Sequence, residues 1–316
     1  MENIRRAKES SVCSVAIGTR GSALALAQTS WIKEQILRWF PDTDVVLKII
    51  KTSADRDTTA SLRSASSVGV FVKELENALL AGDIDIAVHS MKDVPTRLAD
   101  GLRIAAVPER EDARDALIAP HAQSLAELPS GSRIGTGSVR RQAQLLALRP
   151  DFRILDIRGN VDTRLKKLQD GEYDAVVLAC AGLRRLGLEG RISAPLDFGT
   201  MLPAPGQGAL AVEIRANDPK METLSAALNH EPTAMAVAAE RCFLQRMGGG
   251  CNIPVAIYAR PEATALQIDA LAASPDGRQM VRDSARTDIR GAEEAVQRLA
   301  DRMLERGARA ILDNCR

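Results

Sequence analysis

Residues 16–22 of the chain are AIGTRGS and residues 133–138 are RIGTGS, so one strand-to-helix turn occurs twice. A second pair of segments keeps the same order, with AGDIDIAV at 81–88 and DGEYDAVV at 170–177. Such self-similarity indicates an internal duplication. We therefore predict two similar α/β domains. The first copy is about 28 residues longer, and we place the insertion in the polar, Ser/Thr-rich segment 52–68 as a mobile loop.

Short β-branched runs alternate with helical patterns along most of the chain, which indicates the α/β class. In the first copy we expect strands at 14–18, 45–50 and 84–88 and helices at 22–40 and 71–80. A third unit begins near residue 231. It has a helix at 234–247, strands near 255–258 and 266–272, and a last helix on which Ala295, Leu299 and Met303 align.

Composition limits the possible partners. The 316 residues include 42 Lys plus Arg and 41 Asp plus Glu, and the net charge of +1 argues against a nucleic-acid-binding or membrane-binding surface. Only nine of the basic residues are Lys and 33 are Arg, whose planar guanidinium binds carboxylate or phosphate in a bidentate manner. The composition therefore permits local anion recognition without a large net charge.

The chain carries no apolar run of the roughly 20 residues that a membrane-spanning helix needs, and its first residues are too poor in apolar side chains for a secretory signal. We therefore expect a cytoplasmic location. The five cysteines form no CxxC pair and have no His at metal-ligand spacing. We expect neither a disulfide framework nor a metal site.

Glycines and hydroxyl groups at the two repeated turns favour anion binding, because free backbone N–H groups at a helix N-terminus face the ligand. The alternative is that Ser22 and Ser138 only cap helices. Lys92 and Asp93 follow a buried strand at its carboxyl end, where open α/β sheets bind ligands. The alternative for this pair is a surface ion pair in a turn before Pro95.

Arginines gather where predicted strands end. Arg140 and Arg141 open the helix after the second turn, Arg158 and Arg164 follow the strand at 153–157, and Arg184 and Arg185 follow the strand at 175–180. Solvated helix faces explain most such arginines. The shared position at strand ends favours a polyanionic site instead. A dinucleotide site is disfavoured, because Arg140 occupies the position of the third glycine of that motif.

Cys251 lies in the segment MGGGCNIP at 247–254, where three glycines expose the residue that follows them. This thiol is better placed for covalent attachment than Cys13 or Cys180, which we expect in apolar strands. The alternative for Cys251 is a small buried apolar residue. His89, His121 and His230 form no catalytic pattern, and we expect structural roles for all three.

Taken together, the motifs resemble the porphobilinogen deaminase (hydroxymethylbilane synthase) family over essentially the whole chain. The matching segments are GTRGS at 18–22, FVKELE at 71–76, DIAVHSMKDVP at 85–95, ERED at 109–112, GT at 135–136, RR at 140–141, RGNV at 158–161, PGQG at 205–208 and GGC at 249–251. The resemblance implies three domains, of which the first two look like type II periplasmic binding-protein domains. It places domain 1 at 1–108 with a return segment at 209–226, domain 2 at 109–208 and a small α/β domain at 227–316.

The family joins four porphobilinogen molecules head to tail with loss of ammonia at each step, and then releases hydroxymethylbilane by hydrolysis. Its primer is a dipyrromethane cofactor, and the resemblance implies a thioether to Cys251. Asp93 matches the catalytic aspartate, which passes protons and stabilises the azafulvene cation left when ammonia departs. The positions that match substrate-binding residues are Arg20, Ser22, Lys92, Arg140, Arg141, Arg158, Arg164 and Arg185. The resemblance also implies a monomer that passes its product to uroporphyrinogen-III synthase.

One segment departs from the family pattern. Family members often carry Lys-x-Gly-x-Lys-Gly where this chain has SASSVG at 64–69, so Ser64 and Val68 stand in place of both lysines. Arg56 or Arg63 could compensate for them. If neither does, we expect slower elongation.

Two other functions compete with this prediction. A solute receptor or an effector domain of a regulator needs an export signal or a helix-turn-helix, and the sequence shows neither. It would also leave Cys251 without a role. A nucleotide-dependent phosphoryl-transfer enzyme needs a GxxxxGK[ST] motif, which the chain lacks.

Overall fold

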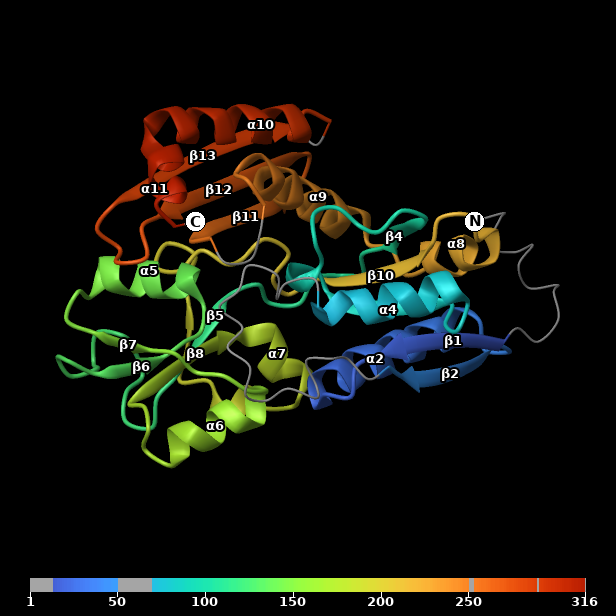
Figure 1. Cartoon of the computed structure of the whole chain (residues 1–316), viewed down its shortest axis with the longest axis horizontal. Coiled ribbons are helices and arrows are strands. Elements are labelled where there is room, and N and C mark those ends of the chain that lie inside the picture. Colours follow the sequence, from blue (N-terminus) through green and yellow to red (C-terminus); the bar gives the residue numbers. More distant parts are fainter. Residues whose placement is uncertain (1–13, 51–69, 250–252, 289, 316) are drawn as a thin grey trace. The chain divides into compact units, whose positions relative to one another are not determined.

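The computed structural model (Figure 1) describes most of the chain, namely residues 14–50, 70–249, 253–288 and 290–315. Three sequence features lie outside the described residues: the segment 52–68 with Ser64 and Val68, Cys13, and Cys251. No helix of the described part is long and apolar enough to cross a membrane.

The chain divides into two compact units. The first consists of Met1–Arg110 and Ala209–Ala234, and the second consists of Glu111–Gly208 and Met235–Arg316. The three-domain division with boundaries at 108, 208 and 226 stays a prediction.

A five-stranded sheet with the order β2-β1-β3-β10-β4 forms the centre of the first unit. Its strands are β1 (Ser14–Thr19), β2 (Asp44–Ile49), β3 (Ile86–Ser90), β4 (Leu102–Ala106) and β10 (Leu210–Arg215). β1 is parallel to β2 and to β3, whereas β10 is antiparallel to β3 and to β4. Because β10 comes from a segment far downstream of β4, the chain returns to this sheet after building another one.

Helices cover both faces of this sheet. They are α2 (Ala23–Trp39), α4 (Val70–Ala81) and α8 (Pro219–Ala226). Ile32 of α2 packs with Ile17 and Ile86 on one face, together with α8, whereas Leu75 of α4 packs with Ala87 on the other. Alternate residues of β3 therefore serve opposite faces, as expected of a central strand that is buried on both sides.

The second unit contains a sheet of the same topology, with the order β7-β6-β8-β5-β9. Its strands are β5 (Asp115–Ile118), β6 (Arg133–Gly135), β7 (Arg153–Leu155), β8 (Ala175–Ala179) and β9 (Ala194–Leu196). β6 is parallel to β7 and β8, and β5 is antiparallel to β8 and β9. Strand for strand this is the arrangement of the first unit, which confirms the predicted duplication.

Three helices and a short turn accompany this sheet, namely α5 (Val139–Leu148), α6 (Val161–Gln169), α7 (Cys180–Arg185) and η3 (Glu189–Arg191). We call each five-stranded sheet with its helices a lobe. Leu145 of α5 packs on one face of the sheet, and Leu165 of α6 and Leu183 of α7 pack on the other. The prediction for Cys180 was wrong in one respect. β8 ends at Ala179, and the buried Cys180 is the first residue of α7.

The same close approach recurs at the end of the first strand of each lobe. A Cβ added to Gly18 would lie 2.3 Å from Ile84 Cδ1, and one added to Gly135 would lie 2.9 Å from Tyr173 Cδ1. Ile84 and Tyr173 occupy corresponding positions in the repeated segments 81–88 and 170–177. A side chain at either glycine would therefore force the neighbouring core side chains to shift.

Each lobe also has the same carboxylate clamp. Asp85 accepts a hydrogen bond from the backbone N–H of Ala16 at 2.9 Å, and Asp174 accepts one from the backbone N–H of Arg133 at 2.7 Å. These bonds tie the start of the first strand to the start of the third. Asp85 and Asp174 therefore occur in both repeats because they hold two strands together, and no catalytic role is needed to explain them.

The C-terminal part of the second unit is a three-stranded antiparallel sheet with the order β11-β12-β13. Its elements are α9 (Glu231–Arg246, which belongs to this unit from Met235 on), β11 (Val255–Glu262), β12 (Ala265–Ala273), β13 (Met280–Asp288), α10 (Ala292–Met303), η4 (Leu304–Ala308) and α11 (Arg309–Asp313). Phe243, Ile257, Ile268 and Leu299 share its core. The small α/β unit expected here is confirmed, and its third strand, β13, was missed.

Candidate active site

Two predicted site segments of the first unit lie at one edge of its sheet. β1 and β3 are parallel neighbours, so their carboxyl ends meet at the same edge. Arg20 follows β1, and Lys92 and Asp93 belong to a short 3-10 turn, η2 (Met91–Asp93), which follows β3. Ser22 is the N-cap of α2, and its Oγ accepts a hydrogen bond from Ala25 N at 3.3 Å. The capping role of Ser22 is therefore observed, and its ligand-binding role stays a prediction.

The η2 turn fixes the backbone of Asp93 and leaves its side chain exposed. Met91 is buried, and its N–H donates to Ala209 O at 3.0 Å; Val94 N donates to Met91 O at 3.1 Å. Asp93 is exposed and makes no hydrogen bond or ion pair with the described residues. A carboxylate on an anchored turn is suited to proton transfer, since its oxygens are not engaged by protein donors.

A buried acidic cluster lies beside this segment. His89 Nε2 and Glu213 Oε2 are 2.9 Å apart, and both side chains are buried. Glu213 Oε1 has no hydrogen-bond partner among the described residues. Burial raises the pKa of Glu76, and the nearby Glu213 carboxylate raises it further. His89 thus has the structural role that we expected, linking β3 to β10.

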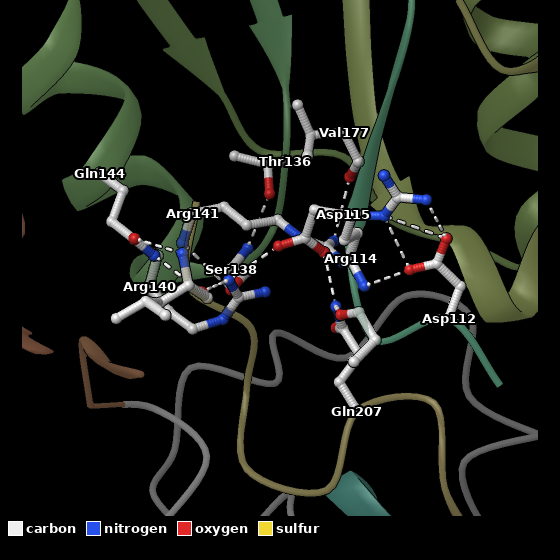
Figure 2. A network of polar contacts seen from close by, with 12 residues as sticks. Asp112, Arg114, Asp115, Thr136, Ser138, Arg140, Arg141, Gln144, Val177 and Gln207 are labelled. Carbon is white, nitrogen blue, oxygen red and sulfur yellow. Dashed lines mark hydrogen bonds and ion pairs between the residues drawn. The ribbon is translucent and has the colours of Figure 1, made fainter. Parts of the chain in front are cut away.

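In the second unit, Arg140 and Arg141 open α5 and meet at Asp115 of β5 (Figure 2). Arg140 Nη1 lies 2.8 Å from Asp115 Oδ2, and Arg141 Nη2 lies 2.7 Å from Asp115 Oδ1. All three side chains are buried. Burial alone would raise the pKa of Asp115, but the two guanidinium groups outweigh it and hold that pKa well below its ordinary value. Burial lowers the pKa of Arg140.

Arg158 lies on the exposed turn that joins β7 to α6, and Arg164 lies in the first turn of α6. Arg158 Nε donates to Asp156 Oδ2 at 2.8 Å, and Arg164 Nε donates to Gly159 O at 2.9 Å. Gly159 has a φ of 111°, a conformation that favours glycine. Both arginines are therefore tied to the segment that follows the carboxyl end of β7.

Arg185 lies on α7 after β8 and is held by the segment Pro205–Gly208. Its Nη2 donates to Gly208 O at 2.6 Å, and burial lowers the pKa of Arg185 to about 10. Gly208 has a φ of 88°, and a Cβ there would lie 2.4 Å from Glu111 O. The glycine is thus required for the close approach that supports Arg185.

The structure therefore brings the second unit's predicted arginines to the carboxyl ends of β6, β7 and β8, which are adjacent strands. It does the same for Arg20, Lys92 and Asp93 in the first unit. Cys251 lies outside the described residues; before it, Gly248 and Gly249 have φ values of 105° and 64°. That all these groups act on one ligand stays a prediction.

Sequence reasoning missed the partners of these residues. Asp115 and Gln207 were given no role, although Gln207 Nε2 donates to Asp115 Oδ1 at 2.9 Å. A signal was present for Asp115, because it begins the apolar run ALIA and a carboxylate in a buried strand requires a basic partner. Glu213 offered the same signal within β10.

The fold is a duplicated α/β architecture in which guanidinium groups and the exposed carboxylate of Asp93 lie at the carboxyl ends of parallel strands. Comparison with known proteins specifies the family. Residues 15–223 match the model of the porphobilinogen deaminase dipyromethane cofactor binding domain, and residues 234–305 match that of the porphobilinogen deaminase C-terminal domain.

Curated relatives agree over nearly the full length. The chain is 48% identical to the porphobilinogen deaminase of Thermus thermophilus over 303 residues, which cover 96% of this chain and 99% of the relative. It is 47% identical to that of Pelobacter propionicus over 297 residues, covering 94% and 96%. The chain belongs to the porphobilinogen deaminase family. It is therefore an enzyme of the transferase class, and its cofactor is dipyrromethane.

Solved structures give a weaker likeness. A periplasmic substrate-binding protein of an ABC transporter from Coxiella burnetii covers 72% of this chain and 96% of its own, with 16% identity and a TM-score of 0.43. At that level the likeness supports no argument about function.

Proposed function

We propose that this chain joins four porphobilinogen molecules head to tail, releases ammonia at each step, and frees hydroxymethylbilane by hydrolysis. The observation that carries the proposal is the family match over residues 15–223 and 234–305. The exposed Asp93 at the end of β3 supports it from the side of geometry.

Asp93 is the catalytic residue in this proposal. Its carboxylate passes a proton as the aminomethyl nitrogen of porphobilinogen leaves, and it stabilises the positive charge that develops on the substrate. The backbone bonds of Met91 and Val94 anchor the η2 turn that carries this carboxylate. Lys92, Ser22 and Arg20 bind substrate carboxylates at the same sheet edge.

The arginines of the second unit neutralise the growing chain. Each porphobilinogen carries an acetate and a propionate, so every step adds two carboxylates. Arg158 and Arg164 are held by an exposed turn, whereas Arg140, Arg141 and Arg185 are held by buried acceptors. Hydrogen bonds between these guanidinium groups and the carboxylates of the growing chain would be charge-assisted, and such bonds are roughly twice as strong as bonds between neutral groups.

The donor set of the second unit fits a dipyrromethane with its four carboxylates. Two buried guanidinium groups share one protein carboxylate, which leaves a positive charge for a ligand carboxylate. Cys251 would hold the group through a thioether, as the family resemblance implies. When bound, the cofactor supplies the free pyrrole carbon to which the first substrate is joined. The donors of Arg140, Arg158, Arg164 and Arg185 would hold its side chains.

Other features of the proposal concern the whole molecule. We infer three domains, with domain 1 at 1–108 and 209–226, domain 2 at 109–208 and the C-terminal domain at 227–316. The return of β10 to the first sheet and the separate sheet β11-β12-β13 support this division. The protein acts as a cytoplasmic monomer and passes hydroxymethylbilane to uroporphyrinogen-III synthase.

Intact mass spectrometry of the purified protein tests the cofactor and its attachment. We expect a mass above that of the sequence by two linked pyrrole units, and loss of this surplus in Cys251→Ser. The matched control is Cys242→Ser, because Cys242 lies in α9 and burial raises the pKa of its thiol. An active protein with the bare mass would overturn the attachment. Ammonia release without a bilane that cyclises to uroporphyrin would overturn the reaction.

A further inference from the structure

Asp115 is the central acceptor of the second unit's buried polar network (Figure 2). Its Oδ2 accepts from Arg140 Nη1, and its Oδ1 accepts from Arg141 Nε at 3.0 Å and Nη2 at 2.7 Å and from Gln207 Nε2 at 2.9 Å. The side chain of Asp115 is fully buried. Both oxygens therefore already accept from protein donors, and neither is exposed to a ligand.

The two arginines use their donors differently. Arg141 gives its Nε and Nη2 edge to Asp115 and its Nη1 to Val177 O, so each of its three nitrogens donates to a protein acceptor. Arg140 uses only Nη1, which donates to Asp115 and to Leu202 O. Among the described residues, the Nε and Nη2 edge of Arg140 has no protein acceptor. That edge is the one that binds a carboxylate in a bidentate manner.

The charges lead to the same assignment. One carboxylate and two guanidinium groups leave a net charge of +1 in a buried site, and burying an uncompensated charge is costly. The nearest acidic residue in the sequence, Asp112, is engaged by Arg114 and Arg184. A carboxylate supplied by a ligand would balance the remaining charge.

We propose that Asp115 is a positioning residue, which locks Arg141 and turns Arg140 so that the free edge of Arg140 binds one carboxylate of the primer or the growing chain. This inference rests on the proposed role of the arginines in anion binding. It adds a division of labour, in which Arg140 touches the ligand and Arg141 and Asp115 act through it.

The test compares Asp115→Asn with Gln144→Met as a matched control. Gln144 is buried in the same network, where it bonds Leu202 N and O and the backbone O of Arg140, but it makes no hydrogen bond to Asp115 and carries no charge. Both variants lose buried hydrogen bonds, so both lower the thermal midpoint. For Asp115→Asn we expect KM for porphobilinogen to rise about tenfold in the cofactor-loaded fraction, with kcat within about threefold of wild type. Gln144→Met leaves KM within about twofold.

Lysine variants decide the case if Asp115→Asn does not fold. Lysine keeps the charge and removes the fork. Arg140→Lys can keep one bond to Asp115, so we expect an unchanged thermal midpoint, a reduced cofactor-loaded fraction by intact mass and a KM raised about tenfold. Arg141→Lys loses its paired bonds to Asp115, and we expect a lower thermal midpoint.

The outcomes distinguish the proposed anion binding by the arginines from the positioning role of Asp115. Wild-type loading and KM in both lysine variants would overturn the proposed anion-binding role of the arginines. A raised KM in Arg140→Lys together with a wild-type KM in Asp115→Asn would overturn only the positioning role of Asp115. If Arg141→Lys alone lost loading, the assigned division of labour between the arginines would be reversed and the inference rejected.

Discussion

The buried pair of His89 and Glu213 should stabilise the first unit through a single hydrogen bond, and two substitutions of Glu213 separate that bond from its charge. Glu213→Gln removes the charge and keeps an oxygen that can accept from His89, whereas Glu213→Leu removes the acceptor. The side chains are 4% and 0% exposed, so water cannot replace the lost partner. A buried donor without an acceptor costs about 1–3 kcal/mol, and we expect the Leu variant to be less stable than the Gln variant by that amount.

Tryptophan fluorescence during urea unfolding measures this difference in the first unit alone. The chain has two tryptophans, Trp31 and Trp39, and both lie on α2. Gln28 of the same helix donates to Ser90 of β3 at 2.9 Å, next to His89. With a slope of about 2 kcal/mol per molar urea, the two midpoints should differ by about 0.5–1.5 M. Equal urea midpoints would refute the reasoning, because the loss of the hydrogen-bond acceptor at position 213 would then have no effect on the free energy of unfolding.

Three further predictions follow from single sites. Asp93→Asn should keep the far-ultraviolet circular dichroism spectrum and lower porphobilinogen consumption by about 10²- to 10⁴-fold; a variant that retains more than a tenth of the activity would exclude general acid-base catalysis by Asp93. Burial and Glu213 raise the pKa of Glu76, so its destabilising ionisation sets in as the pH rises through that pKa. Glu76→Gln should therefore increase the urea midpoint at about pH 7 and leave it unchanged at about pH 4, and an equal gain at both pH values would contradict this. Gly18→Ala places a Cβ 2.3 Å from Ile84 Cδ1 and should cost about 1–3 kcal/mol in the same urea assay, so a wild-type midpoint would show that the strand end can shift freely.

Local sequence predicted the parts of the fold that local patterns determine. The turns at Gly18 and Gly135 could be predicted because the same short motif occurs twice in the sequence. At both places the packing of Ile84 or Tyr173 leaves little space for a side chain, which accounts for the repeated glycine. β13 was missed for the opposite reason. Of its nine residues only Val281 is buried, so its polar sequence carries no strand periodicity, and its pairing with β12 decides its structure.

The placement of β10 and β5 was beyond local patterns for another reason. Each is the antiparallel strand of its sheet, and each comes from a connecting segment far in the sequence from its partners. Only the family resemblance predicted that the chain returns after Gly208. The position of Arg140 and Arg141 at a strand end was likewise predictable, but their shared acceptor Asp115 was not, because side-chain partners across a sheet depend on that same pairing.

The duplication separates residues that serve the fold in both lobes from residues that occur in only one of them. Features that both lobes repeat, such as the clamps at Asp85 and Asp174, serve strand pairing and recur wherever the fold recurs. The lobes differ at the end of the third parallel strand. β3 leads into Lys92 and the exposed Asp93, whereas β8 leads into the buried, apolar start of α7. Because the scaffold is the same in both lobes, folding does not require an acid at this place, and the catalytic role that we propose for Asp93 gives a reason for its presence in only one lobe.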